Sequence, residues 1–176
     1  MHQCDYYPWV CQYFSIFMLR SHRLATLADL PKIVEIYNAT IESRQVTADL
    51  EPVSVESRMA WFQSHQLDMR PLWVMEVDRQ IMAWLSFSSF YGRPAYHQTA
   101  EVSLYVDASV RRTGVGTYLL REAIAFAPEL NLDRLLAFIF CHNEPSLALF
   151  RKFGFERWGR LPGVAKLDSI ERDLCI

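Results

Sequence analysis

The segment from Arg111 to Thr117, with the sequence RRTGVGT, combines residue types that can bind an anion. It lies between an alternating, strand-like segment and an amphipathic, helix-like one, so it is expected to open a helix. A helix N-terminus presents unpaired N–H groups and the positive end of the helix dipole. Gly114 and Gly116 let a ligand approach the backbone, and Arg111 and Arg112 add positive charge. The segment predicts an anion site suited to a pyrophosphate, although the glycines would also suit a tight strand-to-helix turn.

Two nucleotide-binding motifs fit this segment poorly. A P-loop requires G-x-x-x-x-G-K-[ST], and no lysine follows the glycines. A dinucleotide fingerprint requires G-x-G-x-x-G, and Leu119 stands where the third glycine belongs. A nucleotide-binding module is therefore disfavoured.

The elements on either side of the turn predict a βαβ unit. Residues 101–106 alternate, so Glu101, Ser103 and Tyr105 should face opposite to the three aliphatic residues between and after them. The apolar run Leu135–Phe140 is expected to be one strand buried on both faces of a sheet. A strand, a helix and a second strand joined in this way form a parallel pair.

Further strands and helices complete a mixed α/β sheet, with the parallel pair near its middle and helices flanking it. Asp29, Ser54 and Asn143 are candidate helix caps, and Gly154 is expected to end the last helix in a left-handed conformation. The predicted strands are 24–26, 72–77, 81–87, 101–106, 135–140, 157–161 and 170–176, and the first predicted helix runs to about Ile41.

Composition indicates one globular domain, since domains of about 100–200 residues are usual. The chain has 176 residues, of which 51% are apolar and 22% charged. Its 18 Lys+Arg and 20 Asp+Glu give a net charge of -2, which disfavours a nucleic-acid partner.

Residues 1–17 are aromatic and nearly uncharged. They lack the positive region of a signal peptide, and Gln3, Asp5 and Gln12 interrupt any membrane span. The segment is either a short accessory element or an extension upstream of a natural start at Met18. The domain is accordingly expected to be 18–176.

The four cysteines form no C-x-x-C pair, and no histidine stands at zinc-ligand spacing from a cysteine pair. Neither a disulfide framework nor a metal site is indicated. Cys141 is expected to be a small buried thiol, and the compartment to be reducing and cytoplasmic.

Three blocks in chain order resemble the GNAT superfamily of N-acetyltransferases. The R-x-x-G-x-G of 111–116 resembles its motif A. Residues 143–155 resemble its "N-x-x-(A/S)…(Y/H)-x-K-x-G-F" block. Residues 93–106 are similar to the "R-x-A-Y-x-x-T-x-E-x-S-x-Y-V" stretch of phosphinothricin acetyltransferase-like enzymes. The resemblance covers about 20–176 and implies a mixed, mostly antiparallel sheet with a central parallel strand pair.

The resemblance also implies acetyl-CoA as co-substrate, no metal, and acetyl transfer to an amine. Backbone amides of Arg112 to Thr117 would bind the CoA pyrophosphate. The strand backbone before them would hold the pantetheine arm and polarise the thioester carbonyl. The full expected cofactor-binding set is Leu104, Tyr105, Val106, Arg111, Arg112, Thr113, Gly114, Val115, Gly116, Thr117, Asn143, Ser146 and Phe150.

Glu101 matches the glutamate that such enzymes use as general base. An ammonium with a pKa near ~10 must lose a proton before it can attack a thioester. The alternative is a structural carboxylate paired with an arginine. Phe150 stands where the superfamily often has tyrosine and the phosphinothricin group has histidine, so it cannot protonate the leaving thiolate.

The acceptor wall is less defined. Arg93 can bind a substrate carboxylate, or it can be a solvated loop residue. Aromatic side chains near it either line an acceptor pocket or belong to the core. They are Trp84, Phe87, Phe90, Tyr91 and Tyr96.

The resulting prediction is an enzyme that acetylates the primary amine of a small amino acid or analogue of the phosphinothricin or methionine sulfone type. No cysteine stands where a nucleophile would belong, which favours direct attack. The alternatives are acetylation of a protein N-terminus or another amine metabolite, and a non-catalytic acyl-CoA sensor. A small-molecule amine is the expected partner, without nucleic acid or membrane. Dimers are common in the resembled branch, so a homodimer stays open.

Overall fold

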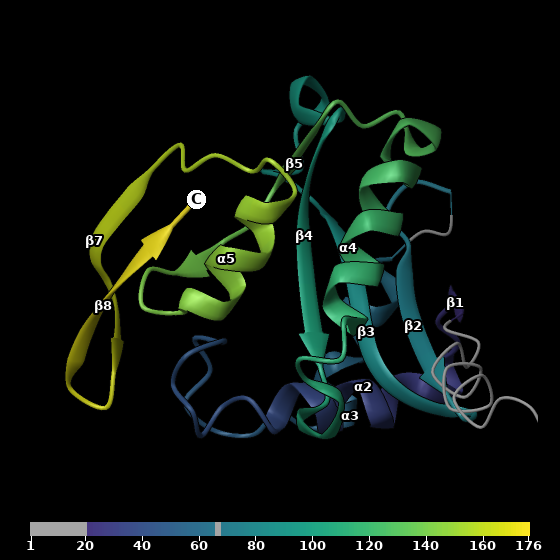
Figure 1. The fold of residues 1–176 in the computed structure, drawn as a ribbon, viewed down its shortest axis with the longest axis horizontal. Helices are drawn as coiled ribbons and strands as arrows, with labels where there is room; N and C mark the ends of the chain where they lie inside the picture. Colours follow the sequence, from purple (N-terminus) through teal and green to yellow (C-terminus); the bar gives the residue numbers. More distant parts are fainter. Residues whose placement is uncertain (1–20, 66–67) are drawn as a thin grey trace, which may run out of the picture.

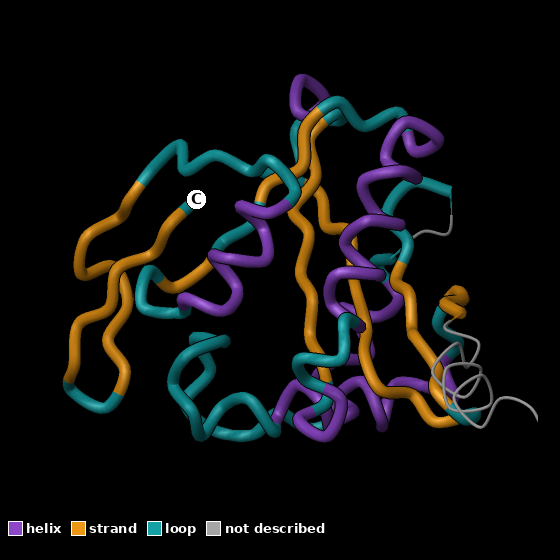
Figure 2. The backbone as a smooth tube through the Cα atoms, in the orientation of Figure 1, coloured by secondary structure: helices purple, strands orange, loops and turns teal. Residues whose placement is uncertain are grey.

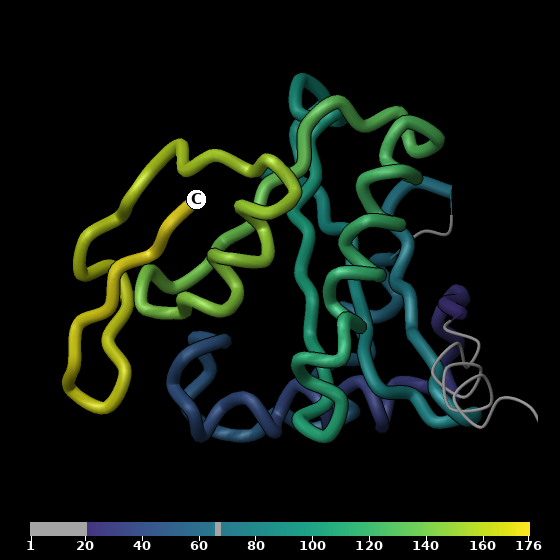
Figure 3. Tube along the Cα trace, in the orientation of Figure 1, coloured from purple at the N-terminus to yellow at the C-terminus, as the bar shows by residue number. Residues whose placement is uncertain are grey.

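The computed structural model describes residues 21–65 and 68–176, so the aromatic segment 1–17 and the expected start at Met18 lie outside the described residues. Figures 1 and 3 follow the chain through its elements. The strands are β1 (Ser21–Leu24), β2 (Leu72–Val77), β3 (Gln80–Ser89), β4 (Thr99–Val106), β5 (Arg134–Leu136), β6 (Ile139–Phe140), β7 (Arg160–Leu167) and β8 (Ile170–Cys175). The α-helices are α2 (Leu30–Asn38), α3 (Val55–Gln63), α4 (Val115–Phe126) and α5 (Glu144–Lys152).

Two sheets organise these elements (Figure 2). The larger has the order β1-β2-β3-β4-β5, and its neighbours are antiparallel except for the parallel pair β4–β5. The smaller has the order β6-β8-β7 and is antiparallel. The predicted mixed, mostly antiparallel sheet with a parallel pair is confirmed, and the pair lies where the two sheets meet (Figure 1).

Helices cover both faces of the larger sheet. One core lies between the sheet and α4, where Leu85 and Phe87 pack with Leu119 and Leu120. The other lies between the opposite face and α2, where Val74 packs with residues such as Ile33. Side chains of the larger sheet are thus buried on both faces, as expected for a sheet between two layers of helices.

The predicted single strand at 135–140 is wrong. The run divides at Ala137 and Phe138 into β5 and β6, and these two short strands belong to different sheets. β5 pairs with β4 only from Thr99 to Glu101, and β6 then turns away to pair with β8. Apolar composition alone could not reveal this change of partner. From Val102 onward, the β5-side edge of β4 therefore has no strand partner among the described residues.

Several element boundaries also differ from the prediction. β1 ends at Leu24 rather than beginning there, α2 ends at Asn38 rather than near Ile41, and β7 begins at Arg160. Asp29 does not cap α2 with its side chain. Its carboxylate instead accepts hydrogen bonds from Thr26 and from Arg23, because a carboxylate within reach of a guanidinium forms the stronger, charge-assisted contact. The Ser54 and Asn143 caps and the left-handed Gly154 are confirmed.

The expectation of a free Cys141 thiol is also wrong. Cys141 and Cys175 form a disulfide across a sequence separation of 34 residues. The pairing of β6 with β8 sets Ile139 opposite Cys175 and brings the two cysteines together. Cysteine spacing carries no information on this pairing, because it depends on which strands become neighbours. No helix within the described part of the chain is long and apolar enough to cross a membrane.

Candidate active site

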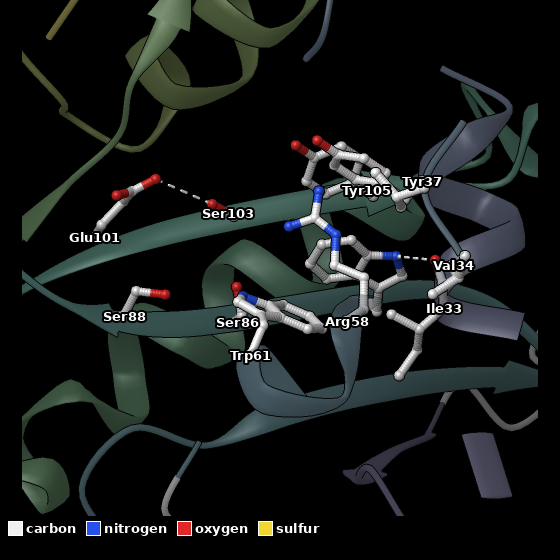
Figure 4. Close-up of a pocket in the computed structure, with 12 residues that line it drawn as sticks. Ile33, Val34, Tyr37, Arg58, Trp61, Ser86, Ser88, Glu101, Ser103 and Tyr105 are labelled. Carbon is white, nitrogen blue, oxygen red and sulfur yellow. Dashed lines mark hydrogen bonds between the residues drawn. The ribbon is translucent and has the colours of Figure 1, made fainter. Parts of the chain in front are cut away.

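A cavity of about 260 Å³ lies on the face of β3 and β4 that is turned toward α2 and α3 (Figure 4). Register pairs three residues of β4 with three of β3 across its floor: Glu101 with Ser88, Ser103 with Ser86, and Tyr105 with Trp84. Its lining residues are Ile33, Val34, Tyr37, Val53, Arg58, Trp61, Trp84, Ser86, Ser88, Glu101, Ser103 and Tyr105. The predicted alternation along 101–106 is confirmed, since the intervening aliphatic residues face the core on α4.

Glu101 contributes the acidic group of this cavity. Its carboxylate is partly buried, and burial raises its pKa because a low dielectric disfavours the charged form. The Ser103 hydroxyl donates to Oε1 at 3.2 Å and partly opposes that rise. No ion pair to Glu101 occurs among the described residues, so the alternative of an arginine-paired structural carboxylate is not realised there. A raised pKa and a free acceptor oxygen suit a general base near neutral pH.

The aromatic residues considered for the acceptor wall lie in three different places in the structure. Trp84 does line the cavity: it stacks on Tyr105 at 4.3 Å between ring centres, and its Nε1 donates to the Ile33 carbonyl at 3.1 Å. Phe87 belongs instead to the core, the other of the two alternatives, because an odd separation from Trp84 along the strand puts it on the opposite face. Phe90, Tyr91 and Tyr96 do not line the cavity; they pack against one another in the loop between β3 and β4.

The glycine turn that the sequence predicts to bind an anion lies at the start of α4. Gly114 is the N-cap residue with φ 89° and ψ 7°, a left-handed conformation that glycine adopts without a Cβ clash. Among the described residues no side chain caps this helix, so its first N–H groups point outward from the turn. Arg111, Arg112 and Thr113 are exposed beside it. An uncapped helix N-terminus next to two guanidinium groups fits a pyrophosphate.

Gly116 has a different role from Gly114. A Cβ at Gly116 would lie 3.2 Å from Leu149 of α5 and 3.5 Å from Leu104 of β4. The missing side chain therefore allows α4, α5 and β4 to meet closely, rather than opening space at the outer side of the turn.

The unpaired edge of β4 lies next to this turn. Leu104, Tyr105 and Val106 belong to the part of β4 that β5 does not reach, so those backbone groups of this part that point away from β3 are available to an extended ligand. Across the divide between the sheets, buried Asn143 caps α5 by accepting from the Ser146 N–H at 3.3 Å. The residues present thus fit an extended chain ending in a pyrophosphate.

Phe150 is buried in the core and packs edge-on against Phe155, with 4.9 Å between ring centres. It lines a second, largely apolar cavity of about 690 Å³ near the C-terminal end of the chain. It does not line the cavity that holds Glu101.

The two residues expected to bind substrate lie in the exposed β3–β4 loop. Arg93 and Tyr96 are both exposed and do not line the Glu101 cavity. The basic residue that does line it, Arg58 of α3, was missed. The only feature of the sequence that could have pointed to Arg58 is its position one turn into the helix that Ser54 caps.

Fold and site together define an acetyltransferase. The chain belongs to the Acetyltransferase (GNAT) family, whose profile matches residues 32–155.

Individual relatives sharpen this assignment. The chain is 55% identical over 155 residues to the Bacillus subtilis (strain 168) protein named "Putative phosphinothricin acetyltransferase YwnH", covering 88% of this chain and 94% of that one. It is 31% identical over 150 residues to the L-methionine sulfoximine/L-methionine sulfone acetyltransferase of Pseudomonas aeruginosa, covering 85% and 87%. The crystal structure of a GNAT superfamily phosphinothricin acetyltransferase from Sinorhizobium meliloti in complex with AcCoA has a TM-score of 0.83 and 27% identity, covering 90% of this chain and 86% of that one.

Proposed function

We propose that this enzyme transfers the acetyl group of acetyl-CoA to the primary amine of a small amino acid or analogue of the phosphinothricin or methionine sulfone type. The observation that carries the proposal is the partly buried Glu101 carboxylate, which has no ion pair among the described residues and lies in a small cavity beside the open edge of β4. The names of the relatives point to the same class of acceptor.

Glu101 acts in this proposal as the general base. Acetyl-CoA supplies an acetyl group activated as a thioester. Glu101 accepts a proton from the acceptor ammonium, directly or through one water, and the neutral amine nitrogen then attacks the carbonyl carbon. A carbon–nitrogen bond forms and the carbon–sulfur bond breaks. The nitrogen releases its second proton to water, and the CoA thiolate takes up a proton from water. Ser103 holds the carboxylate oriented through its 3.2 Å hydrogen bond.

The cofactor-binding residues follow from the two features beside this cavity. Backbone groups of Leu104, Tyr105 and Val106 would bind the pantetheine arm and polarise the thioester carbonyl. The turn from Arg111 to Thr117, which includes Arg112, Thr113, Gly114, Val115 and Gly116, would bind the pyrophosphate. Asn143, Ser146 and Phe150 would form the facing wall.

The test is release of free thiol from acetyl-CoA by the purified protein across a panel of amines. The panel contains phosphinothricin, methionine sulfone, methionine sulfoximine, ordinary amino acids, polyamines and short peptides. Release with the first three and not with peptides or polyamines is the expected result. Release only with peptides would contradict the acceptor class. No release, with acetyl-CoA binding intact in calorimetry, would contradict catalysis on this class.

Three further statements belong to this proposal. The catalytic domain is 18–176, with 1–17 as an extension. Arg93 and Tyr96 contact substrate only if the loop they share reaches an active site. In a homodimer, the active site of the partner would offer this. Light scattering tests whether the dimer forms. We place the enzyme in the cytoplasm, where acetyl-CoA is supplied. Because disulfides are rare there, counting free thiols on protein alkylated at harvest tests the compartment against the Cys141–Cys175 bond.

A further inference from the structure

Arg58 is the only lysine or arginine among the described residues that line the acceptor cavity. It comes from α3, on the opposite side of the cavity from the floor strand β4. In Figure 4 its guanidinium group points into the space beside Tyr105 and Tyr37, and Ser103 lies between it and Glu101. The cavity therefore carries one acidic and one basic group, contributed by different elements.

The guanidinium group is held in place before any substrate binds. Its Nη2 donates to Oδ2 of Asp49 at 2.7 Å, and its carbon lies 4.7 Å from the centre of the Tyr37 ring. The Tyr37 hydroxyl donates to the same Asp49 oxygen at 2.5 Å. Within the described chain, Nε and Nη1 of Arg58 donate to no other residue. A fixed guanidinium with spare donors is a ready partner for a carboxylate.

Asp49 does not cancel this capacity. The side chain of Asp49 is 40% exposed, whereas that of Arg58 is 28% exposed. Water therefore screens the Asp49 charge more than it screens the guanidinium, which faces the cavity.

Glu101 and Arg58 lie at different ends of the cavity. Glu101 and Tyr105 are four residues apart on one strand, which separates their Cα atoms by about 13 Å. Tyr105 lies at the Arg58 end, beside Tyr37, with 5.2 Å between the ring centres. The two charges do not form an ion pair with each other. The cavity thus presents a negative end and a positive end to a single small molecule, with serine hydroxyls and indole rings between them.

We propose that Arg58 binds the α-carboxylate of the acceptor and so makes the enzyme selective for amino acids over amines that lack this group. The inference rests on the proposed function, because it takes the acceptor amine to lie at Glu101. An amino acid carries its ammonium and its carboxylate on one carbon. With the amine bound to Glu101 through one water, as the proposed mechanism allows, the carboxylate on the same carbon is directed along the cavity toward the unused Nε and Nη1 donors of Arg58.

The experiment compares L-methionine sulfone with its carboxamide as acceptors. The amide has the same amine and side chain but no negative charge. Values of kcat/KM are measured for the wild type, Arg58→Gln and Arg58→Lys. For each enzyme, the kcat/KM for the acid is divided by the kcat/KM for the amide, and this ratio is compared between enzymes. The different amine pKa values of the two acceptors then cancel. A charge-assisted hydrogen bond corresponds to roughly a 10- to 100-fold loss for the acid in Arg58→Gln, mainly as a rise in KM. Arg58→Lys should keep part of the preference.

Asp49→Asn is the matched control. It removes the same ion pair from α3 but leaves the guanidinium charge, so it should keep the preference for the acid. Thermal unfolding and acetyl-CoA affinity of all variants show whether the cavity wall has survived.

Equal losses for acid and amide in Arg58→Gln would overturn the proposal and make Arg58 a structural residue. A second pair, methionine sulfone and methionine, tests whether the neutral sulfone oxygens are instead the hydrogen-bond acceptors that Arg58 contacts. Loss of discrimination in that pair, with an unchanged ratio of acid to amide, would also overturn it. If the wild type acetylates both acceptors and Arg58→Gln leaves the ratio of acid to amide unchanged, only the role of Arg58 is refuted. A wild type that releases no thiol with either acceptor refutes the proposed function as well.

Discussion

The two sheets of this protein are stabilised in different ways. The five-stranded sheet is enclosed by helices on both faces, and core residues such as Val74 and Leu85 have no exposed surface. The three-stranded sheet leaves much of its apolar surface open, with Val164 56% and Ile170 53% exposed. The Cys141–Cys175 disulfide and ion pairs such as Arg160 with Asp173 instead connect strands within this sheet.

The two sheets also have different roles: one carries the reacting groups, and the other shapes the site around them. Glu101 lies on the five-stranded sheet, and Arg58 on a helix that packs beside it. The three-stranded sheet instead draws β6 away from β4 and so leaves the β4 edge open. A rigid sheet can hold reacting groups at fixed positions, while a more loosely packed sheet can form one wall of a cofactor slot.

Glu101→Gln is expected to give the largest effect, a loss of rate without a loss of cofactor affinity. Removing a general base lowers kcat by about 10²- to 10⁴-fold at neutral pH. Steady-state thiol release measures the change, and calorimetry should find the affinity for acetyl-CoA unchanged. Glu129→Gln, an exposed change in the short 3-10 helix that follows α4, should keep wild-type kcat. A comparable kcat in Glu101→Gln and the wild type would remove Glu101 from the mechanism.

Cys175→Ser is expected to affect stability and not chemistry. Opening a loop of 34 residues corresponds to a loss of about 3–4 kcal/mol in the free energy of unfolding, measured by urea titration without reductant. Because Cys141→Ser breaks the same bond, it should have a similar effect, and the double variant should lose little more. The kcat at saturating acetyl-CoA should stay unchanged. Additive losses in the double variant would mean that the cysteines act separately.

The features that sequence reasoning predicted well are those with a local cause. Alternation at 101–106 and the Ser54 cap depend only on neighbouring residues, and both were confirmed. The same alternation, counted from Trp84, is enough to distinguish the two alternatives for Phe87, which lies in the core on the other face.

The features that were missed depend on tertiary neighbours. The division of 135–140 and the disulfide depend on β6 pairing with β8, and Arg58 enters the cavity because α3 packs across the sheet. No periodicity in one chain encodes these choices, because an apolar run is equally suited to either sheet.

Gly114→Ala is expected to have a moderate effect at the junction of chemistry and fold. A left-handed φ of 89° costs a residue with a Cβ about 1–2 kcal/mol, so the free energy of unfolding should fall by about that amount. The affinity for acetyl-CoA should fall as well if the turn binds the pyrophosphate. Gly159→Ala is the matched control: φ is not positive there, and the nearest atom to a new Cβ, on Ile176, is 3.9 Å away. Equal stability of the two variants would mean that Gly114 carries no conformational strain when substituted.

The smallest expected effect is a gain in stability from removing the Glu101 charge. Burial raises the pKa of Glu101 in the folded protein above its unfolded value of about 4.5. The protonated form therefore stabilises the fold below pH 4.5, and this contribution is lost as pH rises through the raised pKa. Glu101→Gln cannot ionise, so it should match the wild type near pH 4.5 and become the more stable protein toward pH 8, as measured by urea unfolding at each pH. A wild type that is more stable than the variant at pH 8 would show that the folded protein favours the carboxylate. The five-stranded sheet would then gain stability from its catalytic group, and Glu101 would serve the fold as well as the reaction.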